Sequence, residues 1–237
     1  MSTYVISDIH GQGNLFHAML ENIGFSQADT LYIIGDVVDR GPDGIALLRE
    51  IMAAPNMILL LGNHEHMMAR YLSPDVTEIE IRRWDKNGNA PTLYGWNQLS
   101  GDEKTELLRE LAALPVQKRV RVGEQDFFLV HGFPGDTVHD AVWGRPDPCA
   151  ANPVEGAKLI IGHTPVLYML AEKEAVPGLA AQMKDRGEHP RIYHGPGFID
   201  IDCGCSFPDP IKTLGCLRLE DLAEFYVWNP PDNGAET

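Results

Sequence analysis

The sequence predicts an α/β fold with parallel strands, and two observations support this. The first third of the chain alternates short apolar runs with amphipathic stretches, which is typical of strands joined by crossover helices. Polar residues follow three successive apolar runs at Asp8, Asp36 and Asn63, at spacings of 28 and 27 residues. One strand-plus-helix unit has about that length, so consecutive β-α units explain the spacing without an internal repeat.

The elements of this region follow from the period of the apolar residues. Continuous short apolar runs predict strands, and apolar positions three to four residues apart predict helices. We therefore expect β-α-β-α-β-α order, with strands at Thr3–Ser7, Thr30–Ile34 and Met57–Leu61 and helices at Asn14–Ile23, Asp43–Ala53 and Asn63–Tyr71.

The rest of the chain changes character twice. Residues 74–114 have helical periodicity around Asn87-Gly-Asn89, which predicts a helical insertion. Strand character then returns, with one hairpin-like connection at Gly123-Glu-Gln125. Residues 165–196 are punctuated by Gly and Pro and suit an irregular, cap-like loop, and residues 230–237 suit a flexible tail. We expect a single domain over residues 1–229, with later strands at Lys118–Val122, Phe127–Val130, Leu159–Ile161, Gly197–Ile201, Thr213–Leu219 and Glu224–Trp228.

Composition excludes several classes of protein. The 237 residues are 44% apolar, which allows a buried core and excludes coiled coil, collagen and wholesale disorder. A net charge of −15 disfavours nucleic-acid partners, and the absence of an apolar run of about 18 residues disfavours a membrane partner. No export signal is visible at the amino terminus, so we expect a cytoplasmic protein with reduced cysteines. The oligomeric state stays open.

Six short motifs, most of them directly after an apolar run, carry groups suited to chemistry. In open α/β sheets such groups converge on one crevice. Carboxylate, amide and imidazole ligands without thiolates suit a pair of first-row divalent ions. The motifs are Asp8-Ile-His10, Gly35-Asp-Val-Val-Asp-Arg-Gly41, Gly62-Asn-His-Glu65, His131-Gly132, Trp143-Gly-Arg145 and Gly162-His-Thr164.

Each residue also has a purely structural interpretation. Asp8, Asp36 and Asn63 could cap the helices that follow them, and a single histidine after a strand is often only hydrogen-bonded. Arg145 could be a surface arginine, and Glu65 could be a first-turn residue favoured by the helix dipole. The co-occurrence of six motifs along one chain is what favours a functional site.

Together the motifs resemble the phosphoprotein phosphatase branch of the calcineurin-like metallophosphoesterases, in particular the bacterial and bacteriophage-lambda type serine/threonine protein phosphatases. The resemblance implies a β-sandwich of mixed sheets flanked by helices. It also implies two bound divalent ions, for which manganese is the first choice and iron or zinc are alternatives. The implied metal ligands are Asp8, His10, Asp36, Asn63, His131 and His163, with Asp36 bridging both ions.

The same resemblance implies roles for the remaining residues. Arg40 and Arg145, with Asn63, would bind the phosphoryl group, and His64 supported by Asp39 would protonate the leaving alkoxide. A hydroxide shared by the two metals would attack phosphorus in line. The expected function is therefore hydrolysis of phosphomonoesters in phosphorylated proteins or peptides.

Two other functions remain open. The symmetrical diadenosine tetraphosphatases share the first three motifs but carry Asp at the position of Glu65, so a dinucleoside-polyphosphate hydrolase is the alternative. A non-catalytic phosphate-binding protein would be expected to lack Asp36, Arg40 or His64, and all three are present.

Overall fold

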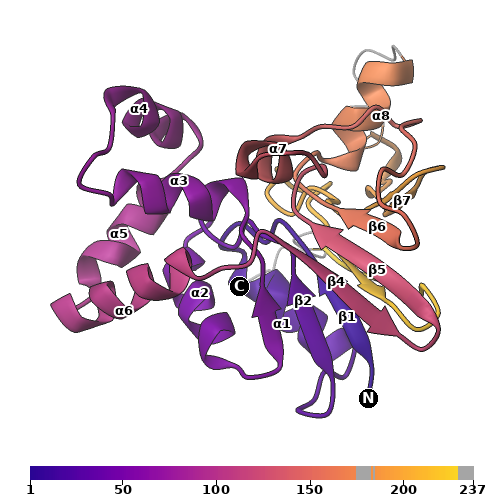
Figure 1. The fold of residues 1–237 in the computed structure, drawn as a ribbon, viewed down its shortest axis with the longest axis horizontal. Helices are drawn as coiled ribbons and strands as arrows, with labels where there is room; N and C mark the ends of the chain where they lie inside the picture. Colours follow the sequence, from indigo (N-terminus) through magenta and orange to yellow (C-terminus); the bar gives the residue numbers. More distant parts are fainter. Residues whose placement is uncertain (175–182, 184, 229–237) are drawn as a thin grey trace, which may run out of the picture.

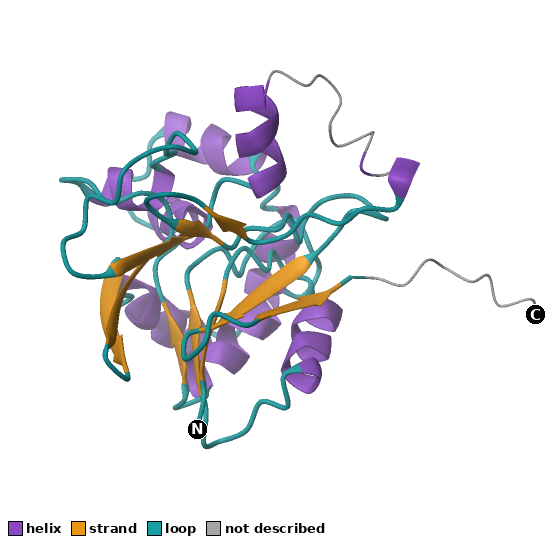
Figure 2. Cartoon of the chain, turned by 90° about the vertical axis from the view of Figure 1, so that its right-hand side faces the viewer, coloured by secondary structure: helices purple, strands orange, loops and turns teal. Residues whose placement is uncertain are grey.

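The computed structural model describes residues 1–174, 183 and 185–228. Two five-stranded sheets face each other, with helices on their outer faces (Figures 1 and 2). The expected tail at residues 230–237 lies outside the described residues. The arrangement confirms the predicted α/β class and the sandwich of mixed sheets. The described part of the chain contains no helix that is long and apolar enough to span a bilayer.

The first sheet has the order β10-β9-β1-β2-β3. Its parallel part is the predicted amino-terminal unit, and two antiparallel strands from the end of the chain complete it. The strands are β1 (Thr3–Ile6), β2 (Thr30–Ile33), β3 (Met57–Leu59), β9 (Leu214–Arg218) and β10 (Glu224–Val227).

The second sheet has the order β4-β5-β6-β8-β7. The predicted hairpin is confirmed as the antiparallel pair β4–β5, while β5, β6 and β8 run parallel. The bounds are β4 (Gln117–Val122), β5 (Gln125–Val130), β6 (Lys158–Ile161), β7 (Tyr193–His194) and β8 (Ile199–Asp200).

The apolar runs of the central strands are continuous because both faces of each sheet are covered. In β1, Val5 packs between the sheets, whereas Tyr4 and Ile6 face the helices. In β6, Ile160 packs between the sheets and Leu159 faces the opposite helical layer. Strands buried on both faces read as uninterrupted apolar runs, which is the pattern seen in the sequence.

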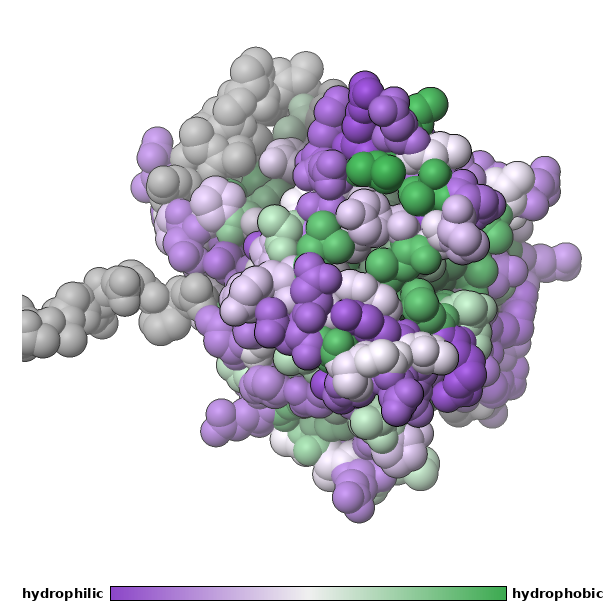
Figure 3. Space-filling model, turned by 90° about the vertical axis from the view of Figure 1, so that its left-hand side faces the viewer, coloured by the Kyte–Doolittle hydropathy of each residue, from purple (hydrophilic) through white to green (hydrophobic). Residues whose placement is uncertain are grey.

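The first helices of the amino-terminal half cover the first sheet. They are α1 (Gly13–Asn22), α2 (Gly44–Ala53) and α3 (Asn63–Tyr71), followed by the predicted insertion α4 (Glu78–Lys86), α5 (Ala90–Gln98) and α6 (Gly101–Ala112). The insertion packs on helices α2 and α3. Thr77 and Ser100 cap α4 and α6 in capping boxes with a glutamate three residues on. The face that carries this insertion mixes hydrophilic and hydrophobic residues (Figure 3).

Two helices in the second half were not predicted. The helix α7 (Val138–Trp143) has only six residues, too few to show a period. The helix α8 (Val166–Glu174) begins the segment 165–196, which we expected to be an irregular, cap-like loop. That expectation is wrong for α8 and for the short strand β7, and residues 175–182 and 184 lie outside the described part of the chain. Leu167 and Met169 of α8 are buried, and this packing outweighs the Gly- and Pro-rich sequence that follows.

Candidate metal centre

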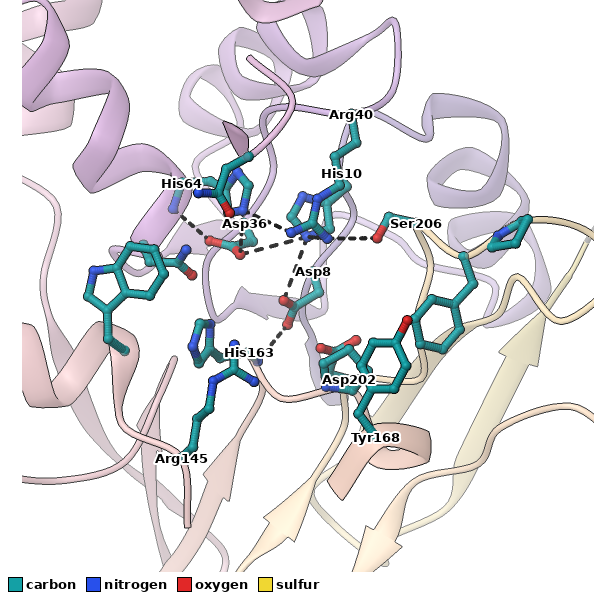
Figure 4. A pocket seen from close by; sticks show the side chains of 16 residues that line it. Asp8, His10, Asp36, Arg40, His64, Arg145, His163, Tyr168, Asp202 and Ser206 are labelled. Atoms are coloured by element: carbon teal, nitrogen blue, oxygen red, sulfur yellow. Dashed lines mark hydrogen bonds and ion pairs between the residues drawn. The ribbon is translucent and has the colours of Figure 1, made fainter. Parts of the chain in front are cut away.

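The ends of strands from both sheets meet in one pocket of about 390 Å³ (Figure 4). Asp8, Asp36 and Asn63 follow β1, β2 and β3 of the first sheet, whereas His131 and His163 follow β5 and β6 of the second. The pocket is lined by Asp8, His10, Asp36, Arg40, Asn63, His64, Asn87, Trp143, Arg145, His163, Pro165, Tyr168, Asp202, Ser206, Phe207 and Pro208. All the predicted site residues except Asp39 and His131 therefore line it, and those two contact residues that do.

The Asp36 carboxylate is shared by two groups of possible metal ligands. One group joins Asp36 with His10 and His64, the other joins it with His131 and His163, and the ligand atoms of each group lie within 4.8 Å of one another. A carboxylate with two oxygens can bridge two cations, as the sequence resemblance implies for Asp36. The first group includes His64 where the resemblance places Asp8, although Asp8 Oδ1 lies 3.9 Å from His10 Nε2.

Backbone carbonyl groups orient two of the imidazoles. His10 Nδ1 lies 3.1 Å from the carbonyl oxygen of Val38, and His131 Nδ1 lies 2.7 Å from that of Ile34. An Nδ1–H that donates to a carbonyl leaves Nε2 as the atom that faces the pocket, and metal-ligating histidines are commonly held in this way.

The electrostatics of the site favour positive charge beside Asp36. Burial alone would lower the pKa of His131, but the Asp36 carboxylate, 3.3 Å from Nε2, raises it to about 10. Burial alone would raise the pKa of Asp36, but the imidazoles of His131 and His64 hold it well below its usual range. A divalent cation between these groups would take the place of the proton that the carboxylate attracts.

His163 offers a ligand atom without a partner. Its buried Nε2 has no hydrogen-bond partner among the described residues, and burial, together with the charge of His131, lowers its pKa to about 2. Its backbone N–H donates a 3.0 Å bond to Oδ2 of Asp8, which fixes the ring relative to the first sheet. A neutral, buried imidazole with a free nitrogen fits a metal cation, so the residues present suit the proposed metal pair.

His64 and Asp39 form a buried pair beside this centre. His64 Nδ1 lies 2.6 Å from Asp39 Oδ2, and its Nε2 faces the pocket, 3.8 Å from Asp36 Oδ2. The side chain of Asp39 is 0% exposed, and it also accepts hydrogen bonds from Trp84 Nε1 and from Thr92 Oγ1, each 2.6 Å long. Three hydrogen bonds hold this carboxylate in place, and the carboxylate in turn fixes the orientation of His64.

The two predicted arginines lie on opposite sides of the ligand cluster (Figure 4). The guanidinium of Arg40 donates to Nε2 of both His10 and His64, at 2.8 and 3.1 Å, and to Ser206 Oγ at 2.8 Å. Arg145 donates a 3.3 Å bond to Thr164 Oγ1, next to His163. Arg145 therefore points into the pocket rather than away from it over the surface.

Left-handed backbone is concentrated at this site. Among the described residues, seven other than glycine have positive φ, and only Leu222 lies outside the predicted site. Such conformations cost ~1–3 kcal/mol each and persist where the surrounding structure enforces them. The six site residues are Asp8, His10, Asp36, Asp39, Arg40 and His163.

Close backbone approach holds these loops in place. Gly35 has φ +91°, and a Cβ atom there would lie 2.7 Å from His131 Nδ1. Glu65 is fully buried and accepts hydrogen bonds from the backbone N–H groups of Asp36, Val37, Val38 and Gly62. Glu65 thus ties two loops together, which corrects our interpretation of it as a residue favoured only by the helix dipole.

The capping alternatives for the ligands are wrong. The N-cap residues of α1, α2 and α3 are Gln12, Asp43 and Gly62, so Asp8 and Asp36 cap none of these helices. Asn63 is the first helical residue, and its Oδ1 lies 2.8 Å from His131 Nε2. All three side chains are therefore directed into the site.

Sequence reasoning missed several residues around the centre. Trp84 lies at an apolar position of a helical pattern and Thr92 lay in no motif, so their contacts with Asp39 were not foreseen. Asp202 lines the pocket and follows the strand β8, which is the same signal that identified the other ligands. His194, by contrast, lies outside the pocket and pairs with Glu224 at 2.7 Å.

Comparison with known proteins agrees with this geometry. Residues 1–187 match the family model of the calcineurin-like phosphoesterases. The chain belongs to the calcineurin-like phosphoesterase family. It is thus a metallophosphoesterase with histidine and aspartate groups that could bind metal ions.

Individual relatives add detail. A symmetrical bis(5'-nucleosyl)-tetraphosphatase from Acidovorax sp. (strain JS42) is 36% identical over 134 residues, which is 55% of this chain and 43% of that relative. The match thus spans less than half of the relative's length.

Two solved structures share the fold. A metallophosphoesterase from Sphaerobacter thermophilus has a TM-score of 0.58 at 19% identity, over 97% of this chain and 89% of that one. A protein serine/threonine phosphatase from Saccharomyces cerevisiae has a TM-score of 0.62 at 13% identity, over 98% and 82%. At these identities the two structures bear on the fold alone.

Proposed function

We propose that this chain is a dinuclear-metal phosphohydrolase whose preferred substrates are dinucleoside polyphosphates. The observation that carries the proposal is the convergence on Asp36 of ligands from both sheets, in a pocket that also holds two arginines. The pocket volume of about 390 Å³ lies within the ~300–1,000 Å³ usual for small-molecule sites. The curated relative described above is named for this activity.

The metal ligands would divide between the two ions around Asp36. Asp8 and His10 would hold one ion, and Asn63, His131 and His163 would hold the other. When bound, two divalent cations supply an activated water molecule and neutralise charge on the phosphate. Manganese fits the mixed oxygen and nitrogen ligands, as iron or zinc would.

The other residues would bind and protonate the substrate. Arg40 and Arg145 approach from opposite sides, so they could each grip non-bridging oxygens of a polyphosphate and stabilise charge that develops in the transition state. His64, held by Asp39 through Nδ1, presents Nε2 to the pocket and could protonate the departing oxygen.

A second candidate is the serine/threonine protein phosphatase activity expected from the sequence. The paired His64 and Asp39 favour it, because a serine alkoxide is a poor leaving group and needs a proton donor more than a nucleotide does. Glu65 also favours it, since the tetraphosphatases are expected to carry Asp there. The relatives' names favour the nucleotide substrate, so the protein phosphatase stands second.

The deciding experiment compares the two substrates at equal enzyme concentration. Protein loaded with manganese is given diadenosine tetraphosphate or a phosphothreonine peptide, and the products are separated by anion-exchange chromatography. We expect ADP as the nucleotide product and a kcat/KM at least tenfold above that for the peptide. Turnover of the peptide alone would support the second candidate, and turnover of neither would reject both.

A further inference from the structure

The wall of the pocket opposite His64 carries an aromatic ring beside polar groups. Tyr168, in the first turn of α8, lines the pocket while its side chain is 52% exposed. Figure 4 shows Tyr168 beside Asp202, across the ligand cluster from His64. An exposed ring in a pocket otherwise rich in charged groups offers an apolar surface to a bound ligand.

The ring of Tyr168 is supported from beneath. Phe207 lies edge-on to it, with ring centroids 5.1 Å apart and an interplanar angle of 64°. Phe207 is 8% exposed and packs with Leu167 and Ile211 in a small separate core. A Cβ atom at Gly204, where φ is +77°, would clash with the Phe207 ring, so the glycine leaves room for it. Packed side chains therefore hold the ring of Tyr168 in position from below.

The same loop reaches the arginine that would grip phosphate. Ser206, next to Phe207, accepts a 2.8 Å hydrogen bond from the guanidinium of Arg40. The backbone N–H of Val166 donates a 3.0 Å bond to the carbonyl of Asp202, which joins the start of α8 to this loop. A phosphate at Arg40 and a planar group at Tyr168 could thus be parts of one ligand.

We propose that Tyr168, backed by Phe207, is a stacking subsite for a nucleobase of the substrate. The inference rests on the proposed function, because it assumes a nucleotide in the pocket. Stacking uses the π-face that every base has, so this subsite tolerates different bases and favours the larger purine rings. Tyr168 would then be a residue that distinguishes nucleotides from inorganic polyphosphates and phosphopeptides.

The test measures binding of two diphosphates that differ by a nucleoside. Calorimetric titrations of the manganese-loaded protein with ADP and with inorganic pyrophosphate are compared for the wild type, Tyr168→Ala and Tyr168→Phe. We expect Tyr168→Ala to weaken ADP binding roughly 5- to 100-fold more than it weakens pyrophosphate binding, the range for loss of one base–aromatic stack. Tyr168→Phe keeps the ring and should retain most of the ADP affinity.

A matched control and a turnover measurement complete the design. Tyr94→Ala removes a 73% exposed tyrosine of α5 that does not line the pocket, so ADP affinity should match the wild type. Equal losses for ADP and pyrophosphate, or no loss for either, would overturn the subsite. If the wild type fails to hydrolyse diadenosine tetraphosphate, the proposed function is rejected, while the ADP titrations still decide the role of Tyr168.

Discussion

The indole N–H of Trp84 donates a 2.6 Å hydrogen bond to Oδ2 of Asp39, so the helical insertion directly contacts the buried pair of His64 and Asp39. The adjacent helix contributes Thr92, whose hydroxyl donates to Oδ1 and accepts from the backbone N–H of Asp39. Arg40 is tied to the same region, since its backbone N–H donates to the carbonyl of Gly88. The insertion is therefore part of the support of the site.

Thr92→Val should weaken both the fold and turnover. The valine has the same shape but removes a donor to a buried carboxylate, which costs ~1.5–3 kcal/mol and should lower Tm by roughly 3–10 °C. Turnover should fall about tenfold because His64 loses part of its support. Thermal melts and steady-state kinetics measure both. Thr105→Val removes only an exposed hydrogen bond within α6, from Thr105 Oγ1 to the carbonyl of Gly101, and should leave turnover unchanged and Tm nearly so. An unaltered Thr92→Val enzyme would contradict the supporting role.

His64→Asn should leave the metal content intact and reduce turnover according to the leaving group. Loss of a general acid lowers turnover by ~10²–10⁴-fold when the leaving group is an alkoxide. For an aryl phosphate, or for a nucleotide leaving group, the reduction should be smaller. Rates on a phosphoserine peptide, an aryl phosphate and diadenosine tetraphosphate test this. His17→Asn on the exposed face of α1 is the control, and equal effects on all substrates would remove the assignment.

Asp36→Asn should weaken both metal sites, because the side chain shared by the two ligand groups loses its charge. In the wild type, manganese at a hundredfold excess over its Kd should stabilise the fold by about 2.7 kcal/mol for each site that it fills. The gain in Tm should then be roughly 5–10 °C and should largely vanish in the variant. Metal analysis and melts with and without chelator provide the measurement, with exposed Asp102→Asn as control. Full metal occupancy in Asp36→Asn would argue against bridging.

Asp200→Asn should stabilise the metal-free protein relative to the wild type, and this difference in stability should grow as the pH rises. Burial, and then the charge of Asp202, raise the pKa of Asp200 well above its usual value, so the folded state holds a proton that the unfolded state releases above about pH 4. The stability contributed by that proton is lost as the pH rises from the unfolded pKa towards the folded one. The variant lacks this loss, so its Tm should exceed that of the wild type by more at pH 8 than at pH 5.

Melts of chelated protein between pH 5 and 8 test this prediction. A gap between the variant and the wild type that stays constant with pH, or narrows, would show that Asp200 is charged in the folded state. Asp126→Asn, at the start of the hairpin strand β5, changes a partly exposed carboxylate and is the comparison.

The sequence was a good guide wherever a functional residue follows an apolar run. Asp8, Asp36, His131 and His163 all follow central strands, and the geometry of the two sheets alone brings them together. The same rule would have identified Asp202 after β8. The Trp143-Gly-Arg145 motif was the reason for assigning Arg145 to the site, and its side chain lines the pocket.

Other parts of the site gave no recognisable signal. Trp84 occupies an apolar position of a helical pattern, and that pattern cannot distinguish a core indole from one that donates to a carboxylate. The helix that carries Tyr168 has only nine residues and precedes a Gly- and Pro-rich stretch, so its periodicity was hidden. Long-range contacts between insertion and loop cannot be read from local spacing.

The left-handed backbone at Asp8, Asp36 and Asp39 bears on what a substitution there would do to the fold. Glycine would occupy such positions with less strain, but it would remove the carboxylate. Glycine at position 39 would also leave the indole N–H of Trp84 and the ring of His64 without their buried partner, so relief of strain there would come with a loss of hydrogen bonds. The carboxylates that strain these loops are therefore also part of what keeps the loops in shape.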